Sequence, residues 1–579
     1  MSDKSLAGGA LAAQLDQVRG RWMNRLHARL AGFASPVTAF VSMPEPKTIG
    51  SYARGRQLRA GNFRFAGQLI EAPDQSIWSL ANPDAAFEAE LQSFTWLDDL
   101  AALGDRGARL QAQAWLLEWI DLFGRGHGPG WDPALTGRRL IRWINHAVFL
   151  LKGMEKAQSD RYFRNLARQT QFLKRRWQAA PAGQPRLEAL TGLIYAGLAL
   201  EGADDLVLPA AHAIAEECAI GIAPDGGIPS RNPEALLETF DLLTWAASAL
   251  SEAGHMPQPA HLLAIERIAP TLRALRHSDG TLARFHGGGP GREGQLDQAL
   301  AASGIRASPL DGLAMGYARL ASGRSSVIVD AAAPPGGLAS GNAHASTLAF
   351  ELISGRHPLV VNCGSGVWFG GEWRRAARTT PSHSTLAVDR YSSSRFAPKS
   401  DAGHSEWLTD IPSKVEAQRS TSLHGQTLLA THDGYSPTHG LIHVRRLELG
   451  SGGRLLSGQD TLGALSESNR IRFEEVMNQT RLSGVQFAIR FHLHPEVVAK
   501  IDLGGRAISL ALPTGETWIF RSEGSADMAL ESSIYLDQSR LKPRATKQIV
   551  LTDTVLDYSS QANWSLSLAN DADPPDRSQ

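Results

Sequence analysis

The sequence predicts a fold in two parts, an N-terminal α/α toroid followed by a C-terminal antiparallel β-sandwich. From about residue 95 to about residue 310, apolar residues recur at the helical spacings i, i+3, i+4 and i+7. Beyond about residue 310, the apolar period falls from 3.6 to 2, which is typical of β-strands. A chain of 579 residues is also too long for one ordinary hydrophobic core. We therefore expect a multidomain α and β protein.

The N-terminal stretch, residues 1–45, is expected to form an amphipathic helix and a proline-broken linker. A helix packed on the surface is the plain interpretation, and binding to a partner or to a membrane surface stays open. The stretch is charged throughout and lacks an apolar core of signal length, so we expect a cytoplasmic rather than a periplasmic protein, although another export route stays open. No segment reaches about 18 uncharged apolar residues, so no membrane span is expected.

The predicted toroid covers residues 46–310. Alternating residues at 62–65 and 67–70 predict a small hairpin near its start. The helical segments that follow have similar lengths, and glycine, proline and aspartate separate them at short intervals. Consecutive antiparallel helices of this kind close into a toroid or stack into a solenoid. The chain shows no repeat of fixed period, which favours the toroid.

The predicted sandwich covers residues 311–565. Segments such as SSVIVDAA, HPLVVNCG and QFAIRFHLH have the composition of strands and are bounded by turn-forming residues. Many strands in succession without intervening helices indicate a large antiparallel sandwich. The tail, residues 566–579, ends in NDADPPDRSQ and is expected to be disordered.

The charge balance limits the classes of partner. Basic and acidic residues both number 58, so the formal net charge is zero. This balance argues against binding nucleic acid over a broad basic face, but it allows a local basic groove for an acidic ligand. The two cysteines, Cys218 and Cys363, are far apart in sequence and are expected to be reduced, although one disulfide stays open.

Basic residues in the helical region are candidates for binding an acidic sugar. Arg138, Arg142 and His146 have the spacing i, i+4, i+8, so they could share one face of a helix. We take Arg138 and His146 as candidate substrate-binding residues. A solvated or salt-bridged helix face is the competing interpretation.

Two loops supply further candidates. Arg231 lies just before a helix that begins with proline in its first turn, where a loop side chain can reach into a groove. Arg284 and His286 lie in the glycine-rich stretch ARFHGGGPG, which lacks the Lys-Ser/Thr of a phosphate-binding loop. We therefore expect Arg231, Arg284 and His286 to contact substrate, and we do not expect a nucleotide.

The strand region contains two histidines that could meet. Strand alternation in GNAHAS would place Asn342, His344 and Ser346 on one face, and His383 would begin another strand. His344 and His383 could then meet across adjacent strands, with Asn362 between them. Two imidazoles and an amide form a weak divalent metal site, because the carboxylate of a strong zinc site is absent. Hydrogen-bonded structural histidines are the alternative, and we expect no other cofactor.

The order of these motifs resembles that of the heparinase II/III-like polysaccharide lyases, and most closely their alphaproteobacterial branch. The resemblance spans roughly residues 95–560. After the helical region come GYARL, HASTLAFEL, VVNCG, RTTPSHSTLAVD, HDGY, IHVR and RFHLHP. Members of the family cleave uronate polysaccharides by β-elimination: a base takes the C5 proton, a neutral or cationic group stabilises the carboxylate, and an acid protonates the leaving oxygen.

The resemblance implies that the chain acts on an acidic polysaccharide or oligosaccharide in a cleft between toroid and sandwich; oligomers stay open. Two family positions in the sandwich are substituted. The catalytic first histidine of the family's H-x-H-x-D motif corresponds to Asn342, and the metal-binding aspartate corresponds to Asn362. The resemblance thus weakens both the usual mechanism and the usual metal site.

Positions in the helical region are substituted as well. The asparagine and histidine of a family G-N-H-L-L-E motif correspond to Gln184 and Pro185, and the family's catalytic tyrosine and a nearby histidine correspond to Ala235 and Leu236. Alanine, leucine and proline side chains cannot transfer protons, so an active enzyme would need another base. The candidates for the base are Tyr391, Tyr435, His286, His383 and His146. The candidates for neutralising the carboxylate are Arg231, Gln184, Arg378 and Asn342.

Three functions remain open from the sequence. The first is a lyase that acts by a modified elimination. The second is a catalytically degenerate member that binds a glycan or regulates envelope polysaccharide metabolism. The third is a glycoside hydrolase or phosphorylase, which would need two carboxylates across the scissile bond; the available acids are Asp225, Glu234, Glu372 and Asp433.

Overall fold

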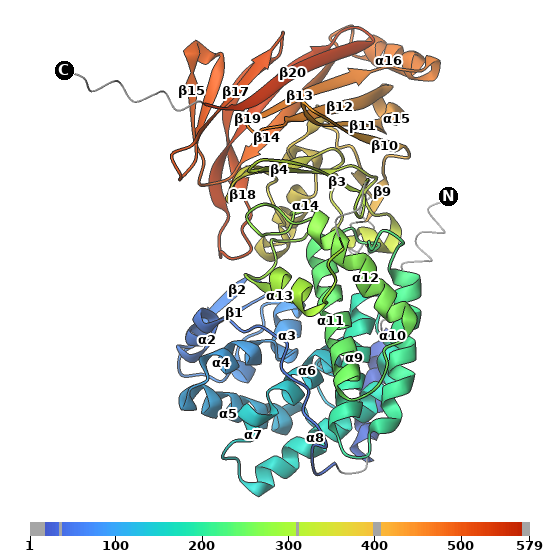
Figure 1. Cartoon of the computed structure of the whole chain (residues 1–579), viewed down its shortest axis with the longest axis vertical. Coiled ribbons are helices and arrows are strands. Elements are labelled where there is room, and N and C mark those ends of the chain that lie inside the picture. The colour runs from blue at the N-terminus through green and yellow to red at the C-terminus, as the bar shows by residue number, and fades with distance from the viewer. Residues whose placement is uncertain (1–17, 34–36, 308–311, 398–406, 570–579) are drawn as a thin grey trace, which may run out of the picture. The chain divides into compact units, whose positions relative to one another are not determined.

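The computed structural model describes residues 18–33, 37–307, 312–397 and 407–569 (Figure 1). The chain divides into two compact units. The helical unit comprises the residues up to 224 together with 237–269 and 298–305, and the sandwich unit comprises 225–236, 270–297 and the residues from 306 onward. Two segments of the predicted toroid region thus belong to the sandwich unit. The predicted domain boundaries stay a prediction.

The N-terminal part of the described chain is helical from residue 18 to residue 30 and continues as the 3-10 turn η1 (Ala31–Phe33). Ala28 and Ala31 are buried, whereas Trp22 on the same helix is 60% exposed. The first 17 residues of the predicted helix lie outside the described residues. The predicted hairpin is present as β1 (Asn62–Phe65) paired with β2 (Gln68–Glu71).

The helical unit is built mainly from helices joined by short loops. Its helices are α2 (Tyr52–Arg59), α3 (Ala85–Gln92), α4 (Trp96–Leu103), α5 (Arg106–Phe123), α6 (Pro133–Asn145), α7 (Ala147–Leu151), α8 (Lys156–Arg176), α9 (Gln184–Ala199) and α10 (Val207–Gly221). Three further helices, α11 (Pro233–Glu252), α12 (Pro259–Ala274) and α13 (Gln295–Ala302), are divided between the two units.

Helix α6 is fixed at its start and along its length. Asp132 caps it by accepting hydrogen bonds from the first backbone N–H groups, and Pro133 occupies the first turn, where no N–H is needed. Glycines allow α6 and α9 to approach closely: a Cβ on Gly192 would lie 2.6 Å from the Cα of Gly137. A larger residue at either position would push the helices apart. This packing sets the position of the carboxyl end of α6.

An aromatic cluster forms the core beside α6. The rings of Phe94 and Trp96 lie 4.7 Å apart, and Trp119 and Trp143 meet edge to face at 5.5 Å. Tyr162 stacks on Trp143 and donates its hydroxyl to the Trp143 carbonyl. Buried aromatic side chains contribute large apolar areas and prefer these tilted geometries. The cluster therefore anchors α4, α5, α6 and α8 to one another.

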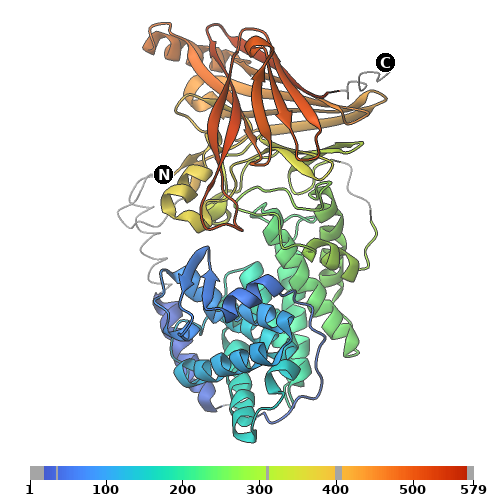
Figure 2. The same cartoon turned by 90° about the vertical axis from the view of Figure 1, so that its left-hand side faces the viewer.

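The sandwich unit contains two large antiparallel sheets (Figure 2). The first has the order β10-β11-β12-β13-β20-β17-β16-β15 and consists of β10 (Val415–Ser422), β11 (Gly425–Tyr435), β12 (Leu441–Gly450), β13 (Leu455–Gly463), β15 (Val498–Asp502), β16 (Ala507–Ala511), β17 (Thr517–Glu523) and β20 (Ser559–Leu568).

The second sheet has the order β18-β19-β14-β6-β5-β4-β3, and β7 also pairs with β14. It consists of β3 (Tyr317–Ser322), β4 (Ser325–Asp330), β5 (Phe350–Ser354), β6 (His357–Val361), β7 (Leu386–Val388), β14 (Val485–Leu493), β18 (Asp527–Tyr535) and β19 (Arg544–Val555). A small sheet joins β8 (Arg395–Phe396) to β9 (Leu408–Asp410), and α14 (Gly371–Ala377), α15 (Ser436–His439) and α16 (Glu467–Gln479) lie in connections.

The two large sheets share one apolar core. Trp564 of the first sheet stacks on Phe350 at 5.8 Å and contacts Phe491 at 4.7 Å, both from the second sheet. Since Leu566 is fully buried, ordered structure continues past the predicted start of the tail at residue 566. Residues 570–579 of the tail lie outside the described residues.

Two strand predictions were wrong. GNAHAS is not a strand: residues Gly337–Asn342 form the 3-10 turn η5, and the chain from 343 to 349 runs without ladder pairing until β5 begins. His383 likewise follows the 3-10 turn η7 (Thr380–Ser382) instead of beginning a strand. Short polar stretches alternate in loops as well as in strands, so a period of 2 over six residues is weak evidence.

Both cysteines are buried free thiols, and burial raises the pKa of each to about 12. Such thiols behave as small apolar side chains. Across the described ranges, no helix is long and apolar enough to span a bilayer.

Candidate functional site: a buried Asp330 network in the sandwich unit

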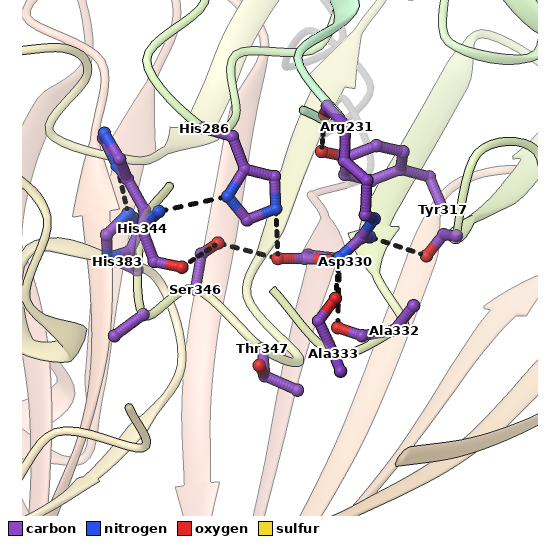
Figure 3. A network of polar contacts seen from close by, with 12 residues as sticks. Arg231, His286, Tyr317, Asp330, Ala332, Ala333, His344, Ser346, Thr347 and His383 are labelled. Carbon is purple, nitrogen blue, oxygen red and sulfur yellow. Dashed lines mark hydrogen bonds and ion pairs between the residues drawn. The ribbon is translucent and has the colours of Figure 1, made fainter. Parts of the chain in front are cut away.

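Asp330 is the centre of a buried polar network that includes several of the predicted site residues (Figure 3). It ends β4 and is fully buried. One carboxylate oxygen accepts from Arg231 at 2.5 Å, and the other accepts from the Ser346 hydroxyl at 2.7 Å. Burial alone would raise the pKa of Asp330, but Arg231 and His286 outweigh it and hold that pKa well below its usual range. The network is therefore built around an ionised carboxylate.

Arg231 is fully engaged within this network. The guanidinium lies over the Tyr317 ring, 4.8 Å from its centre, and the Tyr317 hydroxyl donates back to the Arg231 carbonyl. The Arg231 guanidinium forms an ion pair with Asp330 and also donates to four backbone carbonyl oxygens at 2.7–3.2 Å. These oxygens belong to Met315, Gly316, Ala332 and Ala333. Five N–H groups are all that a guanidinium has. A substrate carboxylate could bind Arg231 only after one of these contacts broke.

A chain of imidazoles continues from Asp330. The Nδ1 atom of His286 accepts from the backbone N–H of His344 at 3.1 Å, so the proton of neutral His286 lies on Nε2, 3.4 Å from Asp330. His286 has a φ of +49°, an uncommon conformation for a non-glycine residue. Backbone strain at this point is held by the contacts on both sides of the ring.

His344 and His383 meet directly, with 3.0 Å between Nδ1 of His344 and Nε2 of His383. The Thr379 carbonyl can only accept, so His383 carries its proton on Nδ1 and donates it in this hydrogen bond. The Nε2 atom of neutral His383 is therefore unprotonated and accepts a hydrogen bond from the Nδ1–H of His344. In neutral His344 this leaves Nε2 as the bare nitrogen. Burial lowers the pKa of His383 to about 4, and burial together with His383 lowers that of His344 well below its usual value. Both rings are therefore neutral near pH 7.

The predicted metal ligands use polar atoms in hydrogen bonds within the protein. The rings of His344 and His383 donate and accept between themselves, and the Asn362 amide oxygen accepts from the Ser384 backbone N–H at 2.9 Å. Within the part of the chain that the structure describes, no three His, Cys, Asp or Glu side chains form a group that could hold a metal ion. These contacts do not fit a divalent ion at His344, Asn362 and His383.

The other predicted residues of the sandwich unit lie in different surroundings. Arg378 is buried, donates to the carbonyls of Ala343 and Ser340, and covers the Phe396 ring. Asn342 is exposed, and its amide oxygen accepts from Arg374 at 3.1 Å. Arg374 and Asn342 thus form the exposed polar surface near His344.

The two candidate tyrosines differ in access. Tyr435 is fully buried, and its hydroxyl donates to the Leu386 carbonyl at 3.0 Å; burial raises its pKa. Tyr391 is 40% exposed, and its ring meets His439 edge to face at 4.6 Å. Of the two, only the Tyr391 hydroxyl is open to a ligand without rearrangement.

Arg284 forms a second buried group with Glu351 and His277. Its backbone N–H and the His277 ring both donate to one Glu351 oxygen, at 3.1 and 3.2 Å. The Arg284 guanidinium lies 3.8 Å from the other Glu351 oxygen, and its Nε and Nη1 atoms make no hydrogen bond among the described residues. This cluster ties the loop after α12 to β5.

The predicted residues of the helical unit belong to two separate ion-pair groups. Arg138 pairs with the buried Glu188 at 2.6 Å, and Gln184 donates to Glu188 at 3.4 Å and to Glu238 at 2.7 Å. His146 instead contacts Asp98 at 2.8 Å. Arg138 and His146, which share a helix face in sequence, therefore serve different acidic partners.

Three of the four carboxylates considered for a hydrolase accept hydrogen bonds from backbone N–H groups. Asp225 accepts from the N–H groups of Gly227 and Met315, Glu234 from Gly289, and Asp433 from Ser413 and Lys414. Glu372 is exposed in the first turn of α14. Turn and loop capping accounts for three of these four acids.

Sequence reasoning missed Asp330 and Glu351. Each carboxylate lies in an apolar strand segment, at the end of SSVIVD and inside FELIS, and each is at most 1% exposed. Buried acids are rare unless they are paired. An acid inside an apolar strand is therefore the sequence signal that could have identified both centres. No measurement tests the catalytic, substrate-binding or metal-binding roles predicted from sequence, and these roles stay predictions.

Comparison with known sequences agrees with the predicted family. The family model "Heparinase II/III-like, C-terminal" matches residues 305–565. A curated relative, FtsZ-localized protein C from Caulobacter vibrioides, is 30% identical over 548 residues, which cover 91% of this chain and 92% of the relative.

Comparison with solved structures confirms the predicted fold class of toroid and sandwich. Heparinase III superposes with a TM-score of 0.68 at 12% identity, over 94% of this chain and 89% of that one. A mutant of the heparan sulfate lyase HepC from Pedobacter heparinus gives a TM-score of 0.58 at 14% identity, over 100% of this chain and 92% of that one.

Proposed function

The chain belongs to the heparinase II/III-like family, and from this premise we propose that it is a catalytically degenerate member that binds an acidic glycan and localises with FtsZ. In this proposal the chain regulates envelope polysaccharide metabolism by binding. The lyase fold supplies the framework, and elimination chemistry has been lost.

One observation supports the loss of chemistry: two of the candidate replacements for the missing catalytic groups, Arg231 and Tyr435, already use their donors in contacts within the protein. Arg231 donates to Asp330 and to four backbone carbonyls, and the Tyr435 hydroxyl donates to the Leu386 carbonyl in the core. The positions that resemble the family's catalytic tyrosine and first histidine carry Ala235 and Asn342. A general base must reach the substrate proton within hydrogen-bond distance. Neither substituted side chain is such a base.

The association with FtsZ is supported by the relative from Caulobacter vibrioides, whose name states that it localises with FtsZ. That relative aligns along nearly the whole of both chains, so the similarity is not confined to one part of this chain. We therefore transfer the localisation, and not only the fold, to this chain. The cytoplasmic location predicted from the sequence forms part of the same proposal.

Fluorescence microscopy tests the localisation. A fusion of the full chain to a fluorescent protein, expressed in Caulobacter vibrioides beside labelled FtsZ, is expected to coincide with FtsZ through the cell cycle. When FtsZ is depleted, the fusion is expected to disperse. Fluorescence that is diffuse, or that keeps its pattern after depletion, contradicts the proposal.

β-Elimination by a modified mechanism is the second candidate, and the geometry of His344 favours it. Its Nε2 is an unprotonated nitrogen that makes no hydrogen bond among the described residues, because His383 fixes the tautomer of His344. The His344 side chain is buried, so a substrate would have to reach this nitrogen from the 4% of the residue that is exposed. Such a nitrogen can accept a proton, although the lowered pKa of His344 makes it a weak base.

Ultraviolet absorbance separates the two candidates, because elimination creates an unsaturated uronate. We expect no absorbance increase when the chain is incubated with heparan sulfate, chondroitin, hyaluronan or alginate. A signal that disappears in His344→Ala would establish elimination with His344 as the base and would overturn the degenerate assignment.

A further inference from the structure

A cavity of about 510 Å³ lies wholly within the helical unit, at the carboxyl end of α6. Its walls come from residues 46–50, from α4 and α5, and from the chain that joins α6 to α7. The volume falls in the range of about 300–1,000 Å³ that is typical of small-molecule sites. The cavity shares no residue with the Asp330 network.

The acid in this cavity is already neutralised. Asp98 is buried and contacts three groups: Arg142 at 3.2 Å, His146 at 2.8 Å and the Thr48 hydroxyl at 2.8 Å. Burial opposes ionisation of Asp98, but Arg142 and His146 outweigh it and lower its pKa. Asp98 is thus a carboxylate whose charge is balanced by Arg142, and it does not repel a second anion as an unpaired acid would.

Two cations in the walls have no acidic partner within the described ranges of the chain. Arg109 on α5 and Lys152 after α7 both line the cavity, and neither forms an ion pair with any residue that the structure describes. The Nε atom of Arg109 is closed off from solvent without a hydrogen-bond partner. The balance of the lining residues is therefore positive, which favours an anionic ligand.

An unsatisfied amide gives independent evidence. Asn145, the last residue of α6, is 6% exposed, and neither its amide nitrogen nor its amide oxygen has a hydrogen-bond partner among the described residues. A buried polar group without partners is rare and points to a missing ion, water or ligand. An amide both donates and accepts, so it matches the hydroxyl groups of a sugar.

We propose that this cavity binds a small acidic sugar, with its carboxylate at Arg109 and Lys152 and its hydroxyl groups at Asn145 and His146. The half-buried Phe149 ring supplies apolar surface in the same wall. The choice of a uronate over another organic anion rests on the proposed function, whereas the position and charge of the site do not. A guanidinium recognises a carboxylate through paired N–H donors, which makes Arg109 the anchor.

Calorimetric titration of the full chain tests the proposal, with glucuronate as the probe. Glucose serves as the neutral-sugar control, and inorganic phosphate serves as the control anion without a sugar ring. We expect glucuronate to bind at least tenfold more tightly than either. Arg109→Ala and Asn145→Leu are each expected to weaken glucuronate binding at least tenfold. Arg106→Ala removes an arginine from the same helix, outside the cavity, and is the matched control that should bind like the wild type.

The outcomes distinguish the cavity from the wider function. Equal binding of glucuronate by wild type, Arg109→Ala and Asn145→Leu overturns the cavity assignment and leaves glycan binding elsewhere intact. Phosphate binding that equals glucuronate binding overturns the sugar assignment. If glucuronate does not bind while the fusion still coincides with FtsZ, the cavity proposal fails and the localisation stands.

Discussion

The Asp330 network and the cavity beside Asn145 are both rich in buried polar groups, but they differ in how those groups are satisfied. Around Asp330, the carboxylate and Arg231 find nearly all their partners inside the protein. In the cavity, the Asn145 amide and the Arg109 Nε have none among the described residues. Buried groups with complete partners stabilise one conformation, whereas incomplete ones keep binding capacity for another molecule.

The difference shows that the sequence does not reveal whether the charge of a basic residue is already paired within the protein. Arg231 and Arg378 look like ligands for an acidic glycan in the sequence, yet their side chains fix loops of the sandwich unit. Arg109 was not singled out from sequence, yet it forms no ion pair with any residue that the structure describes.

Asp330→Asn is expected to destabilise the sandwich unit most. The substitution keeps the size of the side chain but leaves the Arg231 charge buried and unpaired, which typically costs about 3–5 kcal/mol. Hydrogen exchange of β4 peptides, followed by mass spectrometry, reports the change in this unit alone. We expect faster exchange in β4 and unchanged exchange in α6.

Glu475→Gln is the control for this prediction, because Glu475 forms an exposed ion pair with Arg472 at 2.7 Å. Exposed pairs contribute about 0–1 kcal/mol, so exchange should remain near that of the wild type. If Asp330→Asn and Glu475→Gln behave alike, the Asp330 network does not stabilise the fold.

The buried histidines predict an acid-sensitive sandwich unit. The pKa of His383 falls to about 4 in the folded state, so the unfolded chain binds the extra proton between pH 6.5 and 4. Stability must therefore decrease as pH falls through this window, by about 2–3 kcal/mol from His383 at pH 4.5. The pKa of Asp330 is also depressed, and its contribution is lost only below about pH 4.

Hydrogen exchange of β7 and β14 at pH 7.5 and 5, corrected for the intrinsic exchange rate, measures the slope of the unfolding free energy against pH. His383→Gln should have a smaller slope than the wild type. His424→Gln alters an exposed histidine of the same unit and should keep the wild-type slope. An equal slope in the wild type and in His383→Gln would show that the ring is already protonated or exposed.

The fold could be predicted from sequence because periodicity is a local property. The change from helical to alternating spacing near residue 310 identified the two classes of structure. Periodicity could not show that 225–236 and 270–297 belong to the sandwich unit. Their placement depends on pairs such as Arg231 with Asp330 and Arg284 with Glu351, which are far apart in sequence.

The site could be predicted only in part. The sequence suggested that His344 and His383 meet, and their rings do so, although from loops and not across strands. Asp330 was missed because the pattern treats a carboxylate at the end of a strand as solvent-exposed. The cavity was missed because unsatisfied partners are a property of three-dimensional packing, and only His146 among its residues had been singled out.

A pair of small substitutions sharpens the contrast between the two regions. Ser346→Ala removes one hydrogen bond to Asp330 and should destabilise β4 by about 1.5–3 kcal/mol. Asn145→Leu replaces an amide without partners by an apolar side chain of similar size and should stabilise α6 by about 1 kcal/mol. Hydrogen exchange in β4 and in α6 measures the two changes in stability. If both substitutions stabilise, or both destabilise, the two regions do not differ in how their polar groups are satisfied.

The most direct test of the account is the protection that glucuronate gives to α6 in three proteins. Hydrogen exchange of α6 peptides should slow on addition of glucuronate in the wild type and in Ser346→Ala, because the cavity is intact in both. In Asn145→Leu, α6 should exchange more slowly before any ligand is added and should gain no further protection. Protection of Asn145→Leu, or its absence in the wild type, would contradict the account.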